Sequence, residues 1–138
     1  MGSLNFAIYF ILIFLTFGFG YAYGYGEISA SDFRIVNSLG QDINSPVVEQ
    51  QLNLQISLTN LSDKNVDWVY IVQIIDSNGA VVDVNFVTGS LVKNQTLKPA
   101  LFWIPHLDGV YKIETFVWNN LHDIDPLASK STFTITVT

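Results

Sequence analysis

Residues 101–118 constrain the fold more than any other part of this 138-residue chain. Aliphatic and aromatic residues run to Pro105, and Asp108-Gly109 then turns the chain before a second apolar run begins. Proline and an Asp-Gly pair favour turns, because one fixes φ and lacks an N–H while the other tolerates left-handed backbone. The segment therefore predicts two strands joined by a structural corner at Asp108 and Gly109, with Tyr111 as the first large inward-facing residue of the second strand.

Short, evenly spaced apolar segments continue on both sides of this corner. In residues 51–59 four aliphatic side chains alternate without a fault with polar ones, a period of two that is typical of a strand in a sheet with one solvated side. Further strands are expected at residues 33–36, 66–75, 81–88, 97–104, 110–118 and 132–137, with a tight turn at residues 76–79 and an irregular start around Pro99. About seven strands separated by turn signals predict an all-β fold, a single antiparallel β-sandwich over residues 27–138.

The corner also resembles one in immunoglobulin-like sandwiches, where a tyrosine stands two residues before the position that holds the second cysteine in antibody domains. That position is Ile113 here. The segments at residues 67–79, 103–105 and 108–118 together resemble the CARDB-like immunoglobulin-type domains of archaeal and bacterial secreted and cell-surface proteins. The resemblance covers most of residues 32–138. It implies a non-catalytic binding, spacing or assembly module, although a single copy of the domain departs from a simple stalk.

Residues 1–26 carry no charged side chain and form a separate, dense apolar block. Its length approaches the roughly 20 residues that span a bilayer as a helix. Gly20 and Ala22 also place small residues at the −3 and −1 positions of a signal-peptidase site. An N-terminal hydrophobic helix is therefore expected, either as a cleaved signal peptide or as a retained transmembrane anchor. Both alternatives put residues 27–138 outside the cytoplasm, secreted or anchored to the membrane.

The charge balance and the missing cysteine exclude several classes of function. Twelve acidic residues against six basic ones give a net charge of −6, which argues against nucleic acid or an anionic membrane surface as a partner. Without cysteine the domain has no disulfide and no thiolate chemistry. No nucleophile elbow, phosphate-binding loop, zinc-protease helix or dinucleotide motif occurs, so we expect no enzyme activity and no cofactor.

A metal site is the remaining chemical alternative. His106 and His122 are the only histidines, and they fall in loops that we expect at opposite ends of the sandwich. Asp123 and Asp125 form an Asp-x-Asp pair in the second loop, which supplies fewer ligands than a recognisable calcium loop. A small, loop-mediated metal-binding protein is therefore kept as a second alternative.

Two glycosylation sequons, Asn60-Leu-Ser62 and Asn94-Gln-Thr96, fall at expected loop or strand-start positions. Sequons arise often by chance, so they support an exposed location only weakly.

The parity of two strands predicts where a protein partner binds. If Tyr111 and Trp68 point inward, the alternating residues of strands 66–75 and 110–118 point outward, and the usual order of the fold makes these strands neighbours. The outward side then collects five apolar interface candidates: Val69, Ile71, Ile75, Phe116 and Trp118. A contiguous exposed patch of this kind usually marks an interface. The competing interpretation is that a loop or the segment 27–33 covers it.

The leading hypothesis from the sequence is a non-catalytic extracytoplasmic domain that contacts another envelope protein, or copies of itself. The alternative is an accessory subunit of a membrane protein complex, held in the membrane by residues 1–26.

Overall fold

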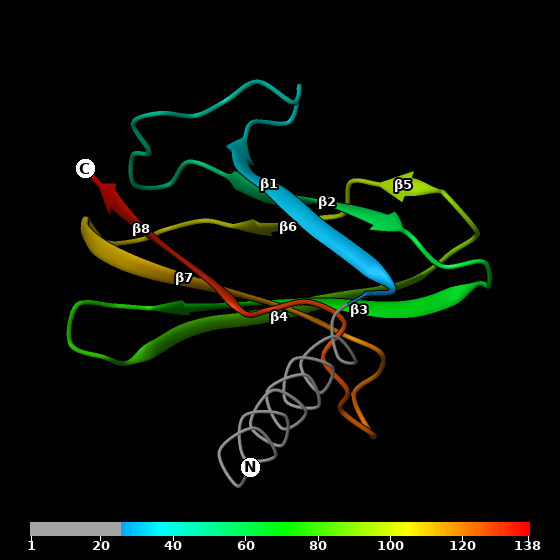
Figure 1. Cartoon of the computed structure of the whole chain (residues 1–138). Helices are drawn as coiled ribbons and strands as arrows, with labels where there is room; N and C mark the ends of the chain where they lie inside the picture. The colour runs from blue at the N-terminus through cyan, green and yellow to red at the C-terminus, as the bar shows by residue number, and fades with distance from the viewer. Residues whose placement is uncertain (1–25) are drawn as a thin grey trace, which may run out of the picture.

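A computed structural model describes residues 26–138, which form eight β-strands in two antiparallel sheets facing one another (Figure 1). The strands are β1 (Ile28–Val36), β2 (Leu52–Asn60), β3 (Val66–Ile75), β4 (Val81–Leu91), β5 (Thr96–Leu97), β6 (Ala100–Trp103), β7 (Gly109–Trp118) and β8 (Ser131–Val137). In one sheet β2 is the inner strand, with β1 on one side and both β5 and β6 on the other. The other sheet has the order β4-β3-β7-β8. The predicted all-β sandwich is confirmed. The predicted N-terminal helix lies outside the described residues.

The difference between about seven predicted strands and eight observed ones comes from Pro99. The expected strand 97–104 is divided into β5 and β6, both of which pair with β2. Proline lacks the N–H that a ladder needs, so the strand is interrupted there. The carbonyl of Pro99 still accepts a hydrogen bond from Ile56 N–H at 3.1 Å. The two short strands therefore occupy the place of the single predicted strand.

The hydrophobic core lies between the sheets and is built from alternate residues of β2, β3 and β7. The core includes Leu52, Leu54, Ile56 and Leu58 from β2, facing Trp68, Tyr70, Val72 and Ile74 from β3 and Tyr111, Ile113 and Val117 from β7. The Tyr70 hydroxyl donates a hydrogen bond to the Leu54 carbonyl at 3.2 Å and so links the two sheets. Burial raises the pKa of this hydroxyl, which keeps it protonated. The residues that the period-two pattern of the sequence predicted to face inward are thus the residues that form the core.

The corner before β7 forms as predicted. The Tyr111 hydroxyl donates a hydrogen bond to the Leu107 carbonyl, four residues upstream, at 2.7 Å. Gly109 has φ 146°, a value that side chains disfavour. The Trp103 ring meets Tyr111 edge-on with centroids 4.9 Å apart. The corner therefore fixes where β7 begins and which of its residues face inward.

The β3–β4 hairpin is closed by the predicted turn at residues 76–79. The Asp76 carboxylate accepts hydrogen bonds from the N–H groups of Asn78 and Ala80, and Gly79 has φ 82°. Further along β4, Gly89 lies opposite Trp68 in the ladder. A Cβ at Gly89 would come within 2.5 Å of the indole ring, so glycine is required there for packing.

Candidate functional site

The five interface candidates lie on one side of the β4-β3-β7-β8 sheet, as their parity predicted. β3 and β7 are neighbours, with Val69 opposite Trp118 and Ile71 opposite Phe116. Ile75, at the end of β3, has the same parity as Val69 and Ile71. None of the five belongs to the core cluster between the sheets. We call this side the outer face of the β4-β3-β7-β8 sheet.

The exposure of the five residues is smaller than the sequence suggested. Val69 is 0% exposed and Ile71 is 7% exposed, whereas Ile75, Phe116 and Trp118 are half-buried. β3 is an inner strand, so each of its outward side chains has a directly opposite neighbour on both sides: Trp118 and Thr88 flank Val69. Only the half-buried members therefore present apolar surface.

The sequence analysis missed the most exposed apolar residues of this region, which come from β4. Phe86 lies opposite Ile71 and Val84 opposite Gln73, which places both on the outer face. They are 51% and 55% exposed, and Val81 and Val82 beside them are about equally exposed. The information was present in the hairpin: once β4 pairs with β3 after the turn at residues 76–79, alternation sends Val84 and Phe86 outward.

An ion pair bounds the outer face on the β8 side. The Lys130 ammonium pairs with the carboxylate of Glu114, a β7 residue that is only 8% exposed. The same ammonium lies 5.9 Å from the centroid of the Phe116 ring, and the rings of Phe116 and Trp118 are 5.5 Å apart. The apolar surface thus has an aromatic pair beside a charged pair on its β8 side, and protein interfaces likewise combine apolar residues with a polar rim.

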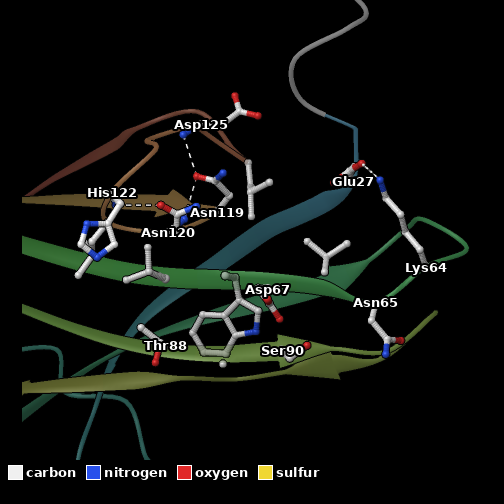
Figure 2. Close-up of a pocket in the computed structure, with 16 residues that line it drawn as sticks. Glu27, Lys64, Asn65, Asp67, Thr88, Ser90, Asn119, Asn120, His122 and Asp125 are labelled. Atoms are coloured by element: carbon white, nitrogen blue, oxygen red, sulfur yellow. Dashed lines mark hydrogen bonds and ion pairs between the residues drawn. The ribbon is translucent and has the colours of Figure 1, made fainter.

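An open hollow of about 1010 Å³ adjoins the outer face at the end where the β7–β8 loop lies (Figure 2). Asn119 and Asn120 hold this loop, because their side-chain oxygens accept hydrogen bonds from the N–H groups of Asp125 and His122, each at 2.8 Å. On the other side of the hollow Lys64 and Glu27 form an exposed ion pair at 3.0 Å. The side chains of Asn119, Asn120, Glu27 and Lys64 are thus engaged in contacts around the hollow. The buried Nε1 of Trp68, which also lines it, has no hydrogen-bond partner among the described residues.

The two histidines lie in the loops at opposite ends of β7, as predicted. His106 Nδ1 is 3.0 Å from a Glu49 carboxylate oxygen, and His122 lies in the loop beside the hollow. Within residues 26–138 no group of three or more His, Asp or Glu side chains is placed to hold a metal ion. Asp123 and Asp125 remain a pair of carboxylates in an exposed loop.

The two sequons differ completely in accessibility. Asn60 is 0% exposed, and its side-chain nitrogen donates to the carbonyls of Lys64 and Leu91 at 2.7 and 3.0 Å. Its side-chain oxygen accepts the N–H of Ser62 at 2.9 Å. Asn94 lies in the exposed turn before β5 with φ 61°. The folded domain therefore offers only one of the two sequon asparagines to solvent.

Together these features define an immunoglobulin-like β-sandwich with one partly apolar outer face. The chain belongs to the S-layer A-like family, whose model matches residues 19–138. This membership indicates a cell-surface β-sandwich domain. No curated protein matches the sequence.

Several solved structures share the fold. The C-terminal domain of wzt has a TM-score of 0.69 at 16% identity, with 84% of this chain and 76% of that chain covered. The CARDB domain of the PF1109 protein from Pyrococcus furiosus, solved with di-metal ions, has a TM-score of 0.57 at 18% identity, with 83% and 96% covered. The CARDB-like resemblance read from the sequence is confirmed.

The fold also occurs as a minor part of some enzymes. The β-glucuronidase of Bacteroides uniformis matches with a TM-score of 0.55 at 16% identity, but the match covers 79% of this chain and only 12% of the enzyme. The family and the fold of this chain are of the non-catalytic S-layer and CARDB-like kind. Among residues 26–138 no helix is long and apolar enough to cross a membrane.

Proposed function

We propose that this chain is a non-catalytic domain of the cell envelope that makes protein–protein contacts through the outer face of its β4-β3-β7-β8 sheet. The observation that carries the proposal is the apolar surface made by Phe86, Phe116 and Trp118, bounded by the Lys130–Glu114 pair. Large aromatic side chains dominate binding energy at protein contacts because they bury much area with few rotatable bonds. The S-layer A-like family supports a location where such contacts assemble proteins at a surface.

We further propose that residues 1–26 export the domain or tether it to the membrane. The uncharged apolar block supports this, and a retained block would suit an accessory subunit that packs against other membrane helices. Intact mass of the native protein, measured together with its extraction behaviour, separates the outcomes. A mass that lacks the block indicates export, and a complete chain that needs detergent indicates a tether. A complete chain released by buffer alone would contradict both.

The contact face is tested by replacing Phe116 and Trp118 with serine in the full-length chain. We expect the double variant to stay folded, because both side chains lie outside the core cluster, and to lose the complexes that chemical cross-linking traps for the wild type in the native envelope. The matched control replaces Asn53 and Gln55 with serine on the solvated side of β2 and should keep those complexes. Unchanged cross-linking in the double variant would contradict the proposal. Global unfolding would show that both residues are core.

A further inference from the structure

The β4 strand is the longest strand at a sheet edge in the described residues, and no other described segment pairs along its free side. It has 11 residues, stands at the end of its sheet, and pairs only with β3 within residues 26–138. An unpaired edge presents a row of free N–H and C=O groups that can add another strand. Natural proteins therefore blunt exposed edges with bulges, prolines, lysines or covering loops.

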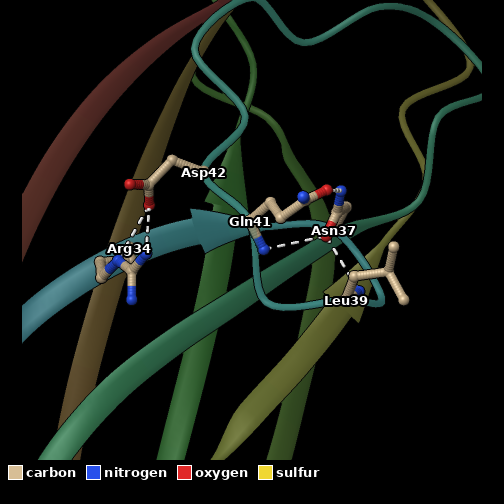
Figure 3. A network of polar contacts seen from close by, with 5 residues as sticks. All are labelled: Arg34, Asn37, Leu39, Gln41 and Asp42. Atoms are coloured by element: carbon tan, nitrogen blue, oxygen red, sulfur yellow. Dashed lines mark hydrogen bonds and ion pairs between the residues drawn. The ribbon is translucent and has the colours of Figure 1, made fainter.

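The edge formed by β1 carries several of these protections (Figure 3). A bulge interrupts it between Ser31 and Arg34, with Asp32 at φ 54°. Arg34 pairs with Asp42 at 2.8 Å, and Ile43 N–H donates to the Ile35 carbonyl at 2.8 Å. The segment after β1 therefore folds back along its free edge.

The other two edges are also short or covered. β6 has four residues and follows Pro99. β8 has seven residues, and its Phe133 ring stacks on Phe33 of β1 at 4.0 Å between centroids, which closes that side of the sandwich. Beyond β8, Thr138 exchanges backbone hydrogen bonds with Pro46 and Val48. β4 has a bulge at Val82 near its start and contacts β6 of the other sheet, but in the described part of the chain no segment folds back along its free edge.

The side chains of β4 favour pairing rather than oppose it. The strand contains no lysine, arginine or proline, and Asp83 is its only charged residue. Val84 and Phe86 are both about half exposed on the outer face. The N–H of Phe86 donates a hydrogen bond to the Asn85 side-chain oxygen at 2.9 Å, which identifies residue 86 as one whose backbone faces the free edge.

We propose that β4 pairs antiparallel with β4 of a second copy of this chain, about a two-fold axis at Asn85, and so joins two sandwiches into one continuous sheet. This deepens the proposed function and rests on it, because it names a partner for the same sheet. In this register Val84 lies opposite Phe86 of the second copy on the outer face. Aromatic and β-branched pairs across strands are favourable.

A second copy fits this edge because the strand is complementary to itself. The register places Asp83 opposite Val87 of the second copy, so no like charges meet although each chain carries a net charge of −6. Beside Asp83 and Asn85 a recess of about 350 Å³, lined also by Phe102 and Trp103, lies on the inward side of the same edge. Val87 of the second copy would lie over it. A two-fold contact of this kind closes on itself and yields a dimer, not an open fibre.

Engineered cysteines test the register directly, because the chain contains none of its own. Asn85→Cys places two thiols at a non-hydrogen-bonded pair, where Cα atoms are about 4.5 Å apart and a disulfide can form. The control Val87→Cys keeps the same strand, but its thiols would stand about 13 Å apart in the proposed dimer. We expect Asn85→Cys in the full-length chain, in mild detergent, to cross-link at least about tenfold faster than Val87→Cys or than Thr134→Cys on the opposite edge.

A charge substitution tests the same edge without cysteine. Phe86→Lys puts a lysine on a half-exposed position of β4, and Thr134→Lys makes the same charge change on β8. We expect sedimentation to show a dimer for the wild type and for Thr134→Lys, and a folded monomer for Phe86→Lys. A monomeric wild type, or equal cross-linking of Asn85→Cys and the controls, would overturn the inference. A dimer that persists in the Phe116→Ser and Trp118→Ser variant, but is lost in Phe86→Lys, would remove Phe116 and Trp118 from the contact and support pairing at the β4 edge.

Discussion

The inner strands of the two sheets, β2 and β3, are similar in length but differ in the polarity of their outward side chains. β2 turns Asn53, Gln55, Ser57 and Thr59 outward, and all four are half-exposed. β3 turns Val69 and Ile71 outward, and both are buried. The inner strand β2 therefore has one apolar side, while the inner strand β3 has apolar residues on both sides. On the first sheet the outward Phe102 of β6, which lies opposite Asn53 and is 57% exposed, is an exception to this polar character.

The difference is already present in the pattern of each strand. A strand with one solvated side alternates apolar and polar residues, as β2 does, whereas a strand covered on both sides is a nearly continuous apolar run. β3 has eight apolar residues among its ten, with Asp67 and Gln73 the exceptions. A continuous run therefore indicates burial on both sides, and not an open apolar surface on one of them.

The largest effect should come from placing a charge on the buried outward position of β3. Val69→Asp removes an apolar side chain that is 0% exposed and buries a carboxylate without a partner, which should destabilise the domain by about 3 kcal/mol or more. Ser57→Asp on the outward side of β2 should change the free energy of unfolding by about 0.5 kcal/mol or less. Urea unfolding followed by tryptophan fluorescence measures both. Equal effects would mean that the two outward sides do not differ.

A smaller effect should follow from Gly89→Ala, which tests which side of β4 faces inward. The added methyl group would meet the Trp68 ring at 2.5 Å and should cost about 2 kcal/mol through overpacking. Ser90→Ala, one residue further on the opposite side, is the control and should be close to neutral. A neutral Gly89→Ala, seen as an unchanged thermal midpoint, would place Gly89 on the outer face and reverse the assignment of Val84 and Phe86.

The corner at Tyr111 should contribute less to the free energy of unfolding than the packing at Gly89, although it fixes which residues of β7 face inward. Tyr111→Phe leaves the Leu107 carbonyl without its 2.7 Å hydrogen bond and should lower the free energy of unfolding by about 1 to 2 kcal/mol. A shift of β7 by one residue would send every outward side chain inward, so the variant should also show slower refolding if the corner sets the register early. An unchanged denaturation midpoint would show that Tyr111 does not hold the corner.

The smallest effect is expected on the solvated sheet. Asp42→Asn removes the carboxylate that, by hydrogen bonding and by charge, raises the pKa of the exposed Arg34 guanidinium. Because the pair is exposed to solvent and screened, the thermal midpoint should stay the same in low and high salt. A clear loss of stability at low salt would show that this side of the sandwich depends on its charges.

Local patterns were enough to predict most of the fold. The alternation of β2, the turn at residues 76–79 and the Tyr111 corner depend on neighbours in sequence, and each was located from the sequence to within a residue or two. The adjacency of β3 and β7 followed from the resemblance to a known sandwich. The division of one strand at Pro99 was anticipated only as an irregularity.

The candidate site was harder to predict because exposure depends on contacts between distant segments. The burial of Val69 depends on Trp118 and Thr88, which lie 49 and 19 residues away and become its neighbours only in the ladder. The apolar stripe at Val84 and Phe86 depends on β4 being an edge strand, which no local pattern states. The burial of Asn60 depends on the carbonyl of Leu91, 31 residues further on.

The buried Asn60 amide also sets an order of events during biosynthesis. Both of its N–H donors are used inside the fold and no space for a sugar exists there, so a glycan at Asn60 and the native domain exclude one another. In a host that glycosylates sequons, a chain modified at Asn60 before folding could not close the end of β2. Asn94 carries no such conflict. In such a host, native folding requires that β2 is complete before a transferase reaches Asn60.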